Sequence, residues 1–250
     1  MTALLVIKTG ETIPSIAVKR RDFETWIAAG AGLSLADVQV VRVFRGETLP
    51  EPESAPGVIV TGSNAMITDR EPWSEETARW LASAVQLGKP ILGICYGHQL
   101  LAHALGGEVR NNPRGREVGT TDVKLNFAAR NDALFGRFAE VLHLPVCHSQ
   151  SVVKLPESAT LLGATALDPN HVVRYGECAW GVQFHPEFDA NIVRGYIDAQ
   201  REDVLRDGLD ADAIWHSATD TADGTFVLRR FAEIVRKRAQ PSRERLAESA

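Results

Sequence analysis

Residues 91–107 read ILGICYGHQLLAHALGG, and this stretch decides the fold. An apolar run of strand type ends at Cys95, which stands between Gly93 and Gly97, and a helical pattern follows. Glycines on both sides let the backbone turn tightly and leave room for a substrate. A cysteine at such a strand-to-helix turn lies at a helix N-terminus, whose partial positive charge favours the thiolate. The pattern predicts a nucleophilic Cys95 on a nucleophile elbow; the alternative is a small core residue.

The chain before Cys95 has the rhythm of an α/β protein. Short apolar runs alternate there with stretches of helical periodicity; the runs are ALLVI, VQVVRVF, GVIVTG and PILGI. Because parallel neighbours need crossover connections, this alternation predicts a mostly parallel central sheet with helices on both faces. Ligands then bind at the carboxyl ends of the strands. From residue 118 onward, shorter runs with tight turns predict antiparallel additions to the sheet.

After Phe188 the sequence changes to charged helical periodicity. We therefore expect one α/β domain over residues 1–190 and a C-terminal helical extension over residues 191–250, packed on the same domain. The stretch FVLRRFAEIVRKR at 226–238 is amphipathic, with an apolar and a basic face. Such a helix most often packs on its own domain, and a homodimer face is the alternative.

The composition excludes several classes of protein. The 250 residues are 44% hydrophobic, and no stretch approaches the roughly 18 consecutive apolar residues of a membrane span. The formal net charge of −5 does not indicate a positively charged surface that would bind nucleic acid. The locally basic residues 110–117 are interpreted as a solvated loop. Three cysteines and an N-terminal apolar stretch too short for a signal peptide predict a cytoplasmic protein with no membrane or nucleic-acid partner.

A thiolate that attacks a carbonyl needs a base, and the base needs a partner that orients it. Among the seven histidines, His185 in WGVQFHPEF ends an apolar strand. Pro186 holds the chain extended, which directs His185 and Glu187 to the same side. A carboxylate two residues on can then accept the Nδ1 proton and leave Nε2 facing the thiol. From spacing alone, a structural His–Glu pair remains an equal alternative.

No metal site is predicted. His148 directly follows Cys147, and adjacent residues on a strand point to opposite faces, so this pair lacks metal-site spacing. Cys147 and Cys178 are interpreted as packing residues.

The two stretches GICYGHQLLAHALGG and WGVQFHPEF, in this order, resemble the class I glutamine amidotransferase family of the Cys-His-Glu type. The resemblance covers roughly residues 1 to 190. It implies a three-layer, flavodoxin-like fold, with Cys95 as nucleophile, His185 as general base and acid, and Glu187 as the residue that orients it. These enzymes free ammonia from the side-chain amide of glutamine. No metal or organic cofactor is implied for this chemistry.

The resemblance also implies residues that surround the substrate. The N–H of Tyr96 would be one oxyanion donor, and Gly62 in VTGSNAM would supply the second. The family usually has Gly-Gly-Pro in this loop, whereas this chain has Thr61-Gly62-Ser63, which puts the second donor in doubt. The implied substrate-binding candidates are Ser63 beside Gly62, Gln99 on the helix after Cys95, and Ser149, Gln150 and Ser151 in CHSQSV.

Three functions compete on this site. The preferred one is a glutaminase that donates ammonia, which implies a synthetase partner, because this chain has no phosphate loop of the G-x-x-x-x-G-K-[ST] type. The second is a γ-glutamyl peptidase that acts on small γ-glutamyl amides with the same residues. The third is a regulatory or interaction protein that keeps the fold without turnover, against which the intact Cys95, His185 and Glu187 argue.

Overall fold

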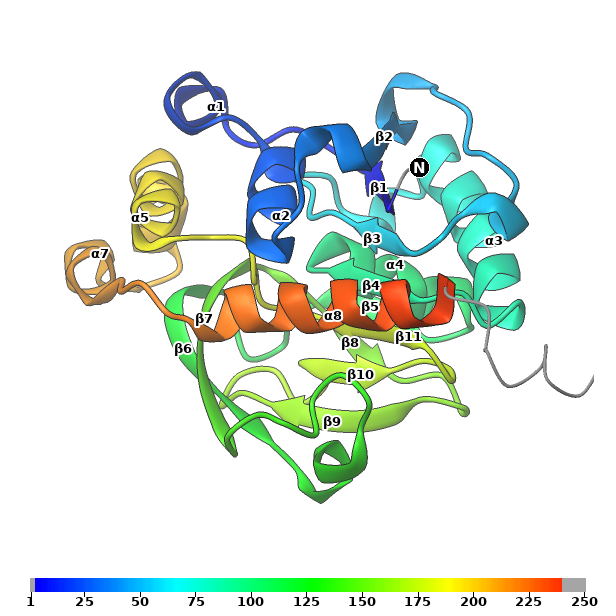
Figure 1. Ribbon diagram of the computed structural model, residues 1–250. Helices are drawn as coiled ribbons and strands as arrows, with labels where there is room; N and C mark the ends of the chain where they lie inside the picture. Colours follow the sequence, from blue (N-terminus) through cyan, green and yellow to red (C-terminus); the bar gives the residue numbers. More distant parts are fainter. Residues whose placement is uncertain (1–2, 240–250) are drawn as a thin grey trace, which may run out of the picture.

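The computed structural model describes residues 3–239, and a nine-stranded sheet with the order β2-β1-β3-β4-β11-β10-β9-β6-β7 forms its centre (Figure 1). The strands of this sheet are β1 (Leu4–Lys8), β2 (Val38–Arg42), β3 (Val58–Val60), β4 (Ile91–Ile94), β6 (Glu117–Leu125), β7 (Val141–His148), β9 (Thr160–Ala164), β10 (Val172–Arg174) and β11 (Ala179–Val182). A second sheet pairs β5 (Glu108–Asn111) with β8 (Gln150–Lys154). The helices are α1 (Pro14–Arg20), α2 (Phe23–Ala31), α3 (Pro72–Gln86), α4 (Tyr96–Ala104), α5 (Ala190–Ala199), α6 (Arg201–Arg206), α7 (Ala211–Ser217) and α8 (Asp223–Ala239).

The strands from β2 to β11 in the sheet order run parallel, and their alternating side chains build two cores. Leu4 and Val6 belong to the core that includes residues of α2 and α8. Leu5 and Ile7, one position along, belong to the core that includes residues of α3 and α4. A strand with helices on both faces is apolar at every position, and β1 is buried throughout. These layers confirm the predicted α/β fold.

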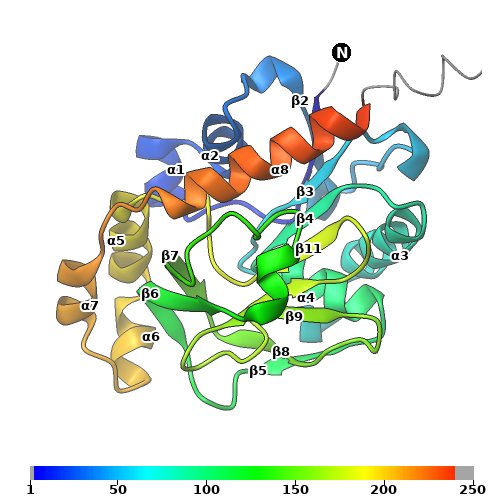
Figure 2. The same ribbon diagram turned by 60° about the horizontal axis from the view of Figure 1, so that its bottom comes forward.

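The strands β10, β9, β6 and β7 continue the sheet in antiparallel pairs, as the sequence predicts. The β6–β7 pair ends close to the carboxyl edge of the parallel strands, because the His185 N–H, just after β11, donates to the Pro145 carbonyl of β7 at 2.8 Å. Figure 2 shows β6 and β7 on the same side of the molecule as α5 and α6. The carboxyl edge is therefore enclosed by segments that are distant in the sequence.

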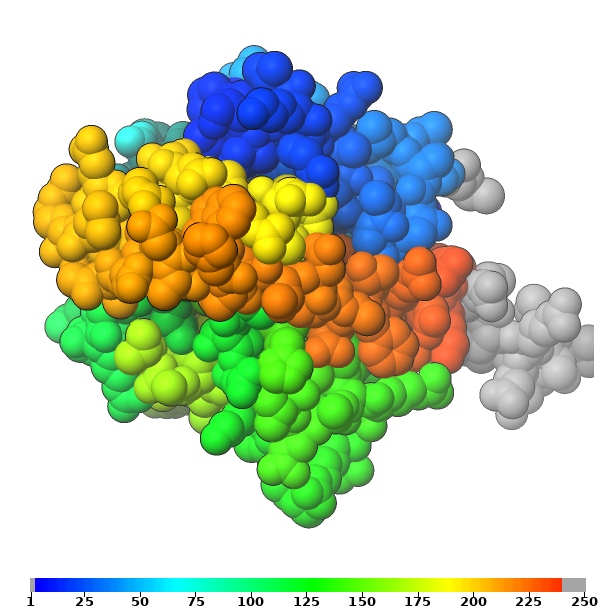
Figure 3. All heavy atoms as spheres, turned by 90° about the vertical axis from the view of Figure 1, so that its left-hand side faces the viewer, coloured from blue at the N-terminus to red at the C-terminus, as the bar shows by residue number. Residues whose placement is uncertain are grey.

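The C-terminal helices pack on the α/β core. Figure 3 shows residues after about 180, in yellow to orange, as a band between the N-terminal elements and the central part of the chain. Val227, Leu228 and Phe231 of α8 are fully buried in the cluster that contains Ile27 of α2. These side chains of the apolar face of α8 thus pack against the same chain. The boundary at residue 190 and the homodimer stay predictions, and residues 240–250 of the expected extension lie outside the described part.

Within residues 3–239, no helix combines the length and apolar character that crossing a membrane requires.

Candidate active site

Cys95 lies at the turn between β4 and α4, at the carboxyl edge of the parallel strands. Its backbone has φ 50° and ψ −101°, a conformation that residues with a side chain rarely adopt. The Cys95 N–H donates to the Val182 carbonyl of β11 at 2.8 Å, and the Cys95 carbonyl accepts from the Gln99 N–H at 3.1 Å. Hydrogen bonds to β11 and from α4 thus fix the turn. Cys95 itself has the strained backbone that is typical of a nucleophile elbow.

Close contacts between backbone segments require glycine at the two positions that flank Cys95. A Cβ on Gly93 would lie 2.4 Å from the Gly97 carbonyl oxygen, and a Cβ on Gly97 would lie 2.5 Å from the Val60 carbonyl oxygen of β3. Both distances are far below van der Waals contact with atoms that cannot move without shifting a strand or a helix. The G-x-C-x-G spacing therefore lets α4 start directly against β3 and β4.

We expect Gly97→Ala to lower the free energy of unfolding by about 3 kcal/mol, because the added methyl overlaps the β3 backbone. Denaturant unfolding measures the change. The control is Ala104→Gly at the end of the same helix, which should cost about 1 kcal/mol through helix propensity and the loss of one partly buried methyl group. An equal or smaller loss for Gly97→Ala would contradict the close approach of β3 and α4.

His185 and Glu187 form a buried pair next to the elbow. β11 runs parallel to β4, with Val182 in register with Ile94, so the turns after both strands meet at one edge. His185 Nδ1 lies 2.8 Å from Glu187 Oε1, and both side chains are almost completely buried. The Phe188 ring stacks on the His185 ring at 4.0 Å between centroids and 12° between planes. The pairing of His185 with Glu187 leaves His185 Nε2 as the ring nitrogen for other contacts.

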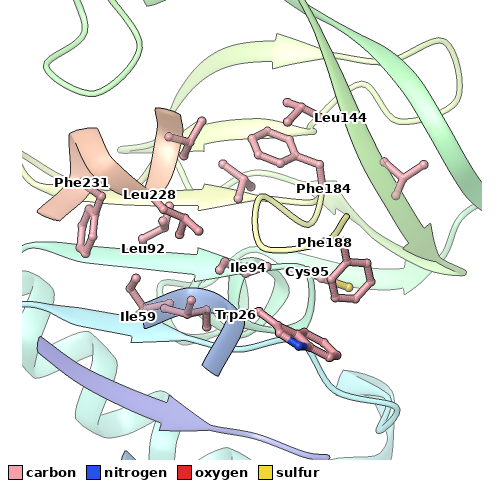
Figure 4. Packing of buried hydrophobic residues seen from close by; sticks show 14 of the residues in the cluster. Trp26, Ile59, Leu92, Ile94, Cys95, Leu144, Phe184, Phe188, Leu228 and Phe231 are labelled. Carbon is pink, nitrogen blue, oxygen red and sulfur yellow. The ribbon is translucent and has the colours of Figure 1, made fainter. Parts of the chain in front are cut away.

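The electrostatic balance at His185 favours the protonated ring. Burial alone would lower the pKa of His185, but the charges of Glu187 and Cys95, and the hydrogen bond to Glu187, raise that pKa to about 10. In Figure 4 the Cys95 sulfur lies beside Phe188, with Trp26 near the same ring. The His185 and Glu187 side chains are almost completely buried, which strengthens their interaction.

The loop after β3 brings Gly62 to both groups. A Cβ on Gly62 would lie 2.9 Å from His185 Cε1 and 3.7 Å from Cys95 Cβ. Within the described residues, neither the Gly62 N–H nor the Tyr96 N–H donates a hydrogen bond to a protein acceptor. Both N–H groups therefore stay candidates for the oxyanion donors, although the loop departs from Gly-Gly-Pro.

A cavity of about 260 Å³ opens above Cys95 and His185. Its size is near the lower end of small-molecule sites, which are about 300 to 1,000 Å³. The lining comprises Phe23, Ser63, Asn64, Ala65, Met66, Cys95, Tyr96, Gln99, Arg116, Cys147, His148, Ser149, Gln150, His185, Tyr196, Gln200 and Asp203. The fold therefore brings together the elbow, the loop after β3, the end of β7 and the helices α5 and α6.

Four of the five predicted substrate-binding residues line the cavity, and the fifth does not. Ser63, Gln99, Ser149 and Gln150 line the cavity, whereas Ser151 in β8 is buried and is not part of the lining. Gln99 Nε2 donates to the Gln150 carbonyl at 2.9 Å and to Gln183 Oε1 at 3.0 Å, which leaves Gln99 Oε1 for a ligand. Gln150 Nε2 donates to Thr68 Oγ1 at 2.8 Å, and this hydrogen bond links β8 to the segment that contains Thr68.

The cavity contains residues that sequence reasoning missed. Arg116 belongs to the basic stretch that was interpreted as a solvated loop, yet its side chain is 17% exposed and lines the cavity. It donates to Asp207 Oδ2 at 2.7 Å and to Gln200 Oε1 at 3.1 Å, which places it beside α6. The sequence indicates Arg116 only as part of a locally basic stretch. No sequence pattern points to Tyr196, Gln200 or Asp203, because helical periodicity does not show which part of the fold a helix packs against.

Cys147 also lines the cavity, although the sequence favoured packing alone. The Cys95 thiol lies 3.8 Å from the Cys147 carbonyl oxygen. Burial, and to a smaller extent the charge of Cys95, raises the pKa of the Cys147 thiol to about 12. Cys147 therefore keeps its proton at neutral pH and is no competing nucleophile.

The sequence is similar to proteins of one family. The family model described as "Glutamine amidotransferase class-I" matches residues 22–194. A glutamine-hydrolysing GMP synthase of Aeropyrum pernix is 37% identical over 143 residues, which are 57% of this chain and 25% of that protein. Gamma-glutamyl peptidase 5 of Arabidopsis thaliana is 31% identical over 144 residues, 57% of this chain and 57% of that protein. The chain thus spans a quarter of the first relative and just over half of the second.

Solved structures share the fold over nearly the whole chain. A glutamine amidotransferase of Thermotoga maritima has a TM-score of 0.72 at 22% identity, over 94% of this chain and 98% of that chain. A glutamine amido transferase of Methylobacillus flagellatus has a TM-score of 0.69 at 24% identity, over 95% of this chain and 94% of that chain. The likeness includes the C-terminal helices, because a coverage of 94% extends beyond residue 194.

Proposed function

Because this chain belongs to the glutamine amidotransferase class-I family, we propose that it hydrolyses the side-chain amide of glutamine to glutamate and ammonia through a thioester on Cys95. The observation that carries this proposal is the meeting of three features at the edge of one small cavity, which Cys95, Tyr96 and His185 line. These are the strained backbone of Cys95, the buried His185–Glu187 pair and the two free N–H groups of Gly62 and Tyr96.

In the proposed reaction the Cys95 thiolate attacks the γ-carbonyl carbon and forms the carbon–sulfur bond. The N–H groups of Tyr96 and Gly62 hold the oxyanion of the tetrahedral intermediate. Protonated His185 gives its proton to the departing nitrogen, so the carbon–nitrogen bond breaks and ammonia leaves. Neutral His185 then takes a proton from water, the resulting hydroxide attacks the thioester, and glutamate leaves with regeneration of the Cys95 thiolate.

The charges in the cavity suit the α-amino acid end of such a substrate. Arg116 offers a cation to the α-carboxylate, since its planar guanidinium suits that group. Gln99 Oε1 and the Asp203 carboxylate offer acceptors to the α-ammonium group. A zwitterionic γ-glutamyl group therefore has complementary partners at one end and Cys95 at the other.

Arg116→Gln is expected to raise KM for L-glutamine by about 10- to 100-fold while kcat changes by less than about threefold, because a charged hydrogen bond to the substrate is lost. Steady-state kinetics measure both constants. The control is Arg114→Gln in the same basic stretch, which lies outside the cavity lining and bonds to the Ala166 carbonyl. Equal KM values for the two variants would remove Arg116 from substrate binding.

A second candidate function is γ-glutamyl peptidase activity on the same residues. The observation that favours it is the reach of α5 into the cavity, since Tyr196 adds a polar side chain that ammonia as a leaving group does not need. The relative from Arabidopsis thaliana is a gamma-glutamyl peptidase. A synthetase partner that receives ammonia is the corresponding proposal for the first function, and it is supported by the similarity to glutamine-hydrolysing GMP synthase.

The deciding experiment measures glutamate release by the full-length chain from L-glutamine and from a γ-glutamyl dipeptide, with Cys95→Ser as control. A higher kcat/KM on glutamine supports the glutaminase, and a higher value on the dipeptide supports the peptidase. Hydroxylamine should divert the thioester to γ-glutamyl hydroxamate with either substrate. No release and no hydroxamate would instead support the third function, a regulatory protein without turnover.

A further inference from the structure

Four buried side chains with metal-binding atoms meet behind one wall of the cavity. They are Glu117 at the start of β6, His148 at the end of β7, Asp168 in the loop between β9 and β10, and His171 just before β10. One nitrogen or oxygen atom of each lies within 4.8 Å of those of the other three. Asp168 and His171 are 0% exposed, and the other two are 5% exposed. Groups of this kind are seldom buried together without a partner that neutralises them.

The hydrogen bonds of this cluster leave polar atoms unused. Within the described residues, both ring nitrogens of His171 and the Oδ2 atom of Asp168 are buried without a hydrogen-bond partner. His171 Nδ1 lies 3.6 Å from Glu117 Oε2 and 3.7 Å from Asp168 Oδ2, beyond hydrogen-bond distance. Zinc with four nitrogen and oxygen ligands at about 2.0 to 2.2 Å holds neighbouring ligand atoms about 3.3 to 3.6 Å apart. The spacing around His171 is thus close to that of metal ligands.

The partners of His148 require a proton or a metal ion between His148 and Glu117. His148 Nδ1 lies 3.0 Å from the Gln150 carbonyl oxygen, which can only accept, so Nδ1 carries a hydrogen. His148 Nε2 lies 2.9 Å from Glu117 Oε2. Two lone pairs cannot face each other at that distance, so either a proton or a metal ion lies between them.

The surroundings keep both carboxylates as acceptors. The Thr165 hydroxyl donates to Glu117 Oε1 at 2.7 Å, and its oxygen accepts from the Asp168 N–H at 2.9 Å. The Asn170 N–H donates to Asp168 Oδ1 at 2.9 Å. Each carboxylate therefore has one oxygen held by a donor and the other directed to the cluster. A hydrogen bond from the far ring nitrogen of His148 to a backbone carbonyl is also the usual support of a metal-binding histidine.

We propose that Glu117, His148, Asp168 and His171 bind one zinc ion. Two imidazole nitrogens and two carboxylate oxygens form a tetrahedral donor set of a type that zinc accepts, and no open position is left for catalysis. Coordination requires the pair of His148 Nε2 and Glu117 Oε2 to open by about 0.5 Å. Because the site is buried, the ion is taken up as the chain folds.

The position of the site gives the ion a structural task that is separate from the proposed reaction. It joins the ends of β6 and β7 to the loop before β10. The Gln150 carbonyl that accepts from His148 Nδ1 also accepts from Gln99 Nε2 in the cavity wall. The ion would therefore hold the wall that carries Gln99 and Ser149 without contact with the reacting atoms.

The test uses the full-length chain with Cys95→Ser, which removes the reactive thiol as a competing ligand. The protein is unfolded with guanidinium and a chelator, refolded with or without Zn²⁺, and desalted. We expect about one zinc per chain by mass spectrometry and a thermal midpoint at least about 5 °C higher after refolding with zinc. A zinc content near zero with an unchanged midpoint would overturn the proposal and assign the countercharge to protons on the histidines.

Variants in the same background locate the ion. Asp168→Asn and His171→Gln, which keep the size of the side chains, should lose the zinc and the shift in midpoint. The control is His143→Gln, an exposed histidine of β7 beside Asp122, which should keep both. Equal zinc in all three variants would place the ion elsewhere and overturn the proposal. If the first two variants fail to fold, X-ray absorption of the parent decides, since nitrogen and oxygen ligands at about 2.0 to 2.2 Å support the site and a sulfur at about 2.3 Å overturns it.

Discussion

His185→Ala is expected to lower kcat for glutamine hydrolysis by about 10⁴-fold or more, with a folded protein that still binds substrate. The proposed reaction uses His185 twice, first as the acid that protonates the departing ammonia and then as the base that takes a proton from the attacking water. Within the described lining of the cavity, His148 is the other histidine, and the Gln150 carbonyl and Glu117 engage both of its ring nitrogens. Within this lining, no second histidine is therefore free to replace His185.

The measurement for this variant is the release of glutamate at saturating glutamine, together with the thermal midpoint. His103→Ala is the matched control, because His103 lies on α4, bonds to Glu75 at 3.0 Å and does not line the cavity. The control should keep kcat within about twofold. Activity of His185→Ala within tenfold of the wild type would refute the assignment of His185 as general acid and base.

Glu187→Gln is expected to lower kcat/KM by about 10³- to 10⁴-fold and to change its pH dependence. The charge of Glu187 is the largest of the effects that raise the pKa of His185 to about 10. A raised pKa means that His185 keeps its proton until the pH rises through that value. The wild type should therefore lose activity only as the pH approaches about 10, when the acid for the departing ammonia is lost. Without Glu187 the pKa falls, so this alkaline loss should begin at lower pH.

The pH profile of kcat/KM from about pH 6 to pH 11 checks both parts of the prediction. Glu75→Gln is the control, since it also removes a carboxylate that pairs with a histidine, His103, outside the cavity. That variant should keep the wild-type profile. A Glu187→Gln enzyme whose alkaline limb stays near pH 10 would show that another group sets this limb.

The elements that carry their own local signal could be predicted from the sequence. The apolar run before Cys95 and the helical pattern after it predict a turn, and the structure has β4, a strained Cys95 and α4 there. The pairing of His185 with Glu187 could be predicted for the same reason, because an extended backbone through Pro186 places both side chains on one side. The local backbone geometry depends on neighbouring residues, so it can be predicted without knowledge of the fold.

Contacts between distant segments could not be predicted in this way. The order of strands that puts β11 beside β4 depends on the packing of the whole sheet, and no residue near either strand encodes it. Ser151 was expected beside Ser149 and Gln150, but β8 pairs with β5, and Ser151 lies buried in that pair opposite Arg110. The sequence around His148 gives no metal-site spacing, and it does not indicate which side chains lie near this residue. Its partners Glu117, Asp168 and His171 come from three other segments.

The place of β11 in the sheet has a consequence for the order of events during synthesis. Translation produces Cys95 long before His185, and the hydrogen bond from the Cys95 N–H to Val182 requires β11 to be in place. A nascent chain that has not reached β11 therefore carries a cysteine without its base and without the full support of its strained turn. If Cys95 and His185 act as proposed, the sheet must be complete as far as β11 before the chain can release glutamate.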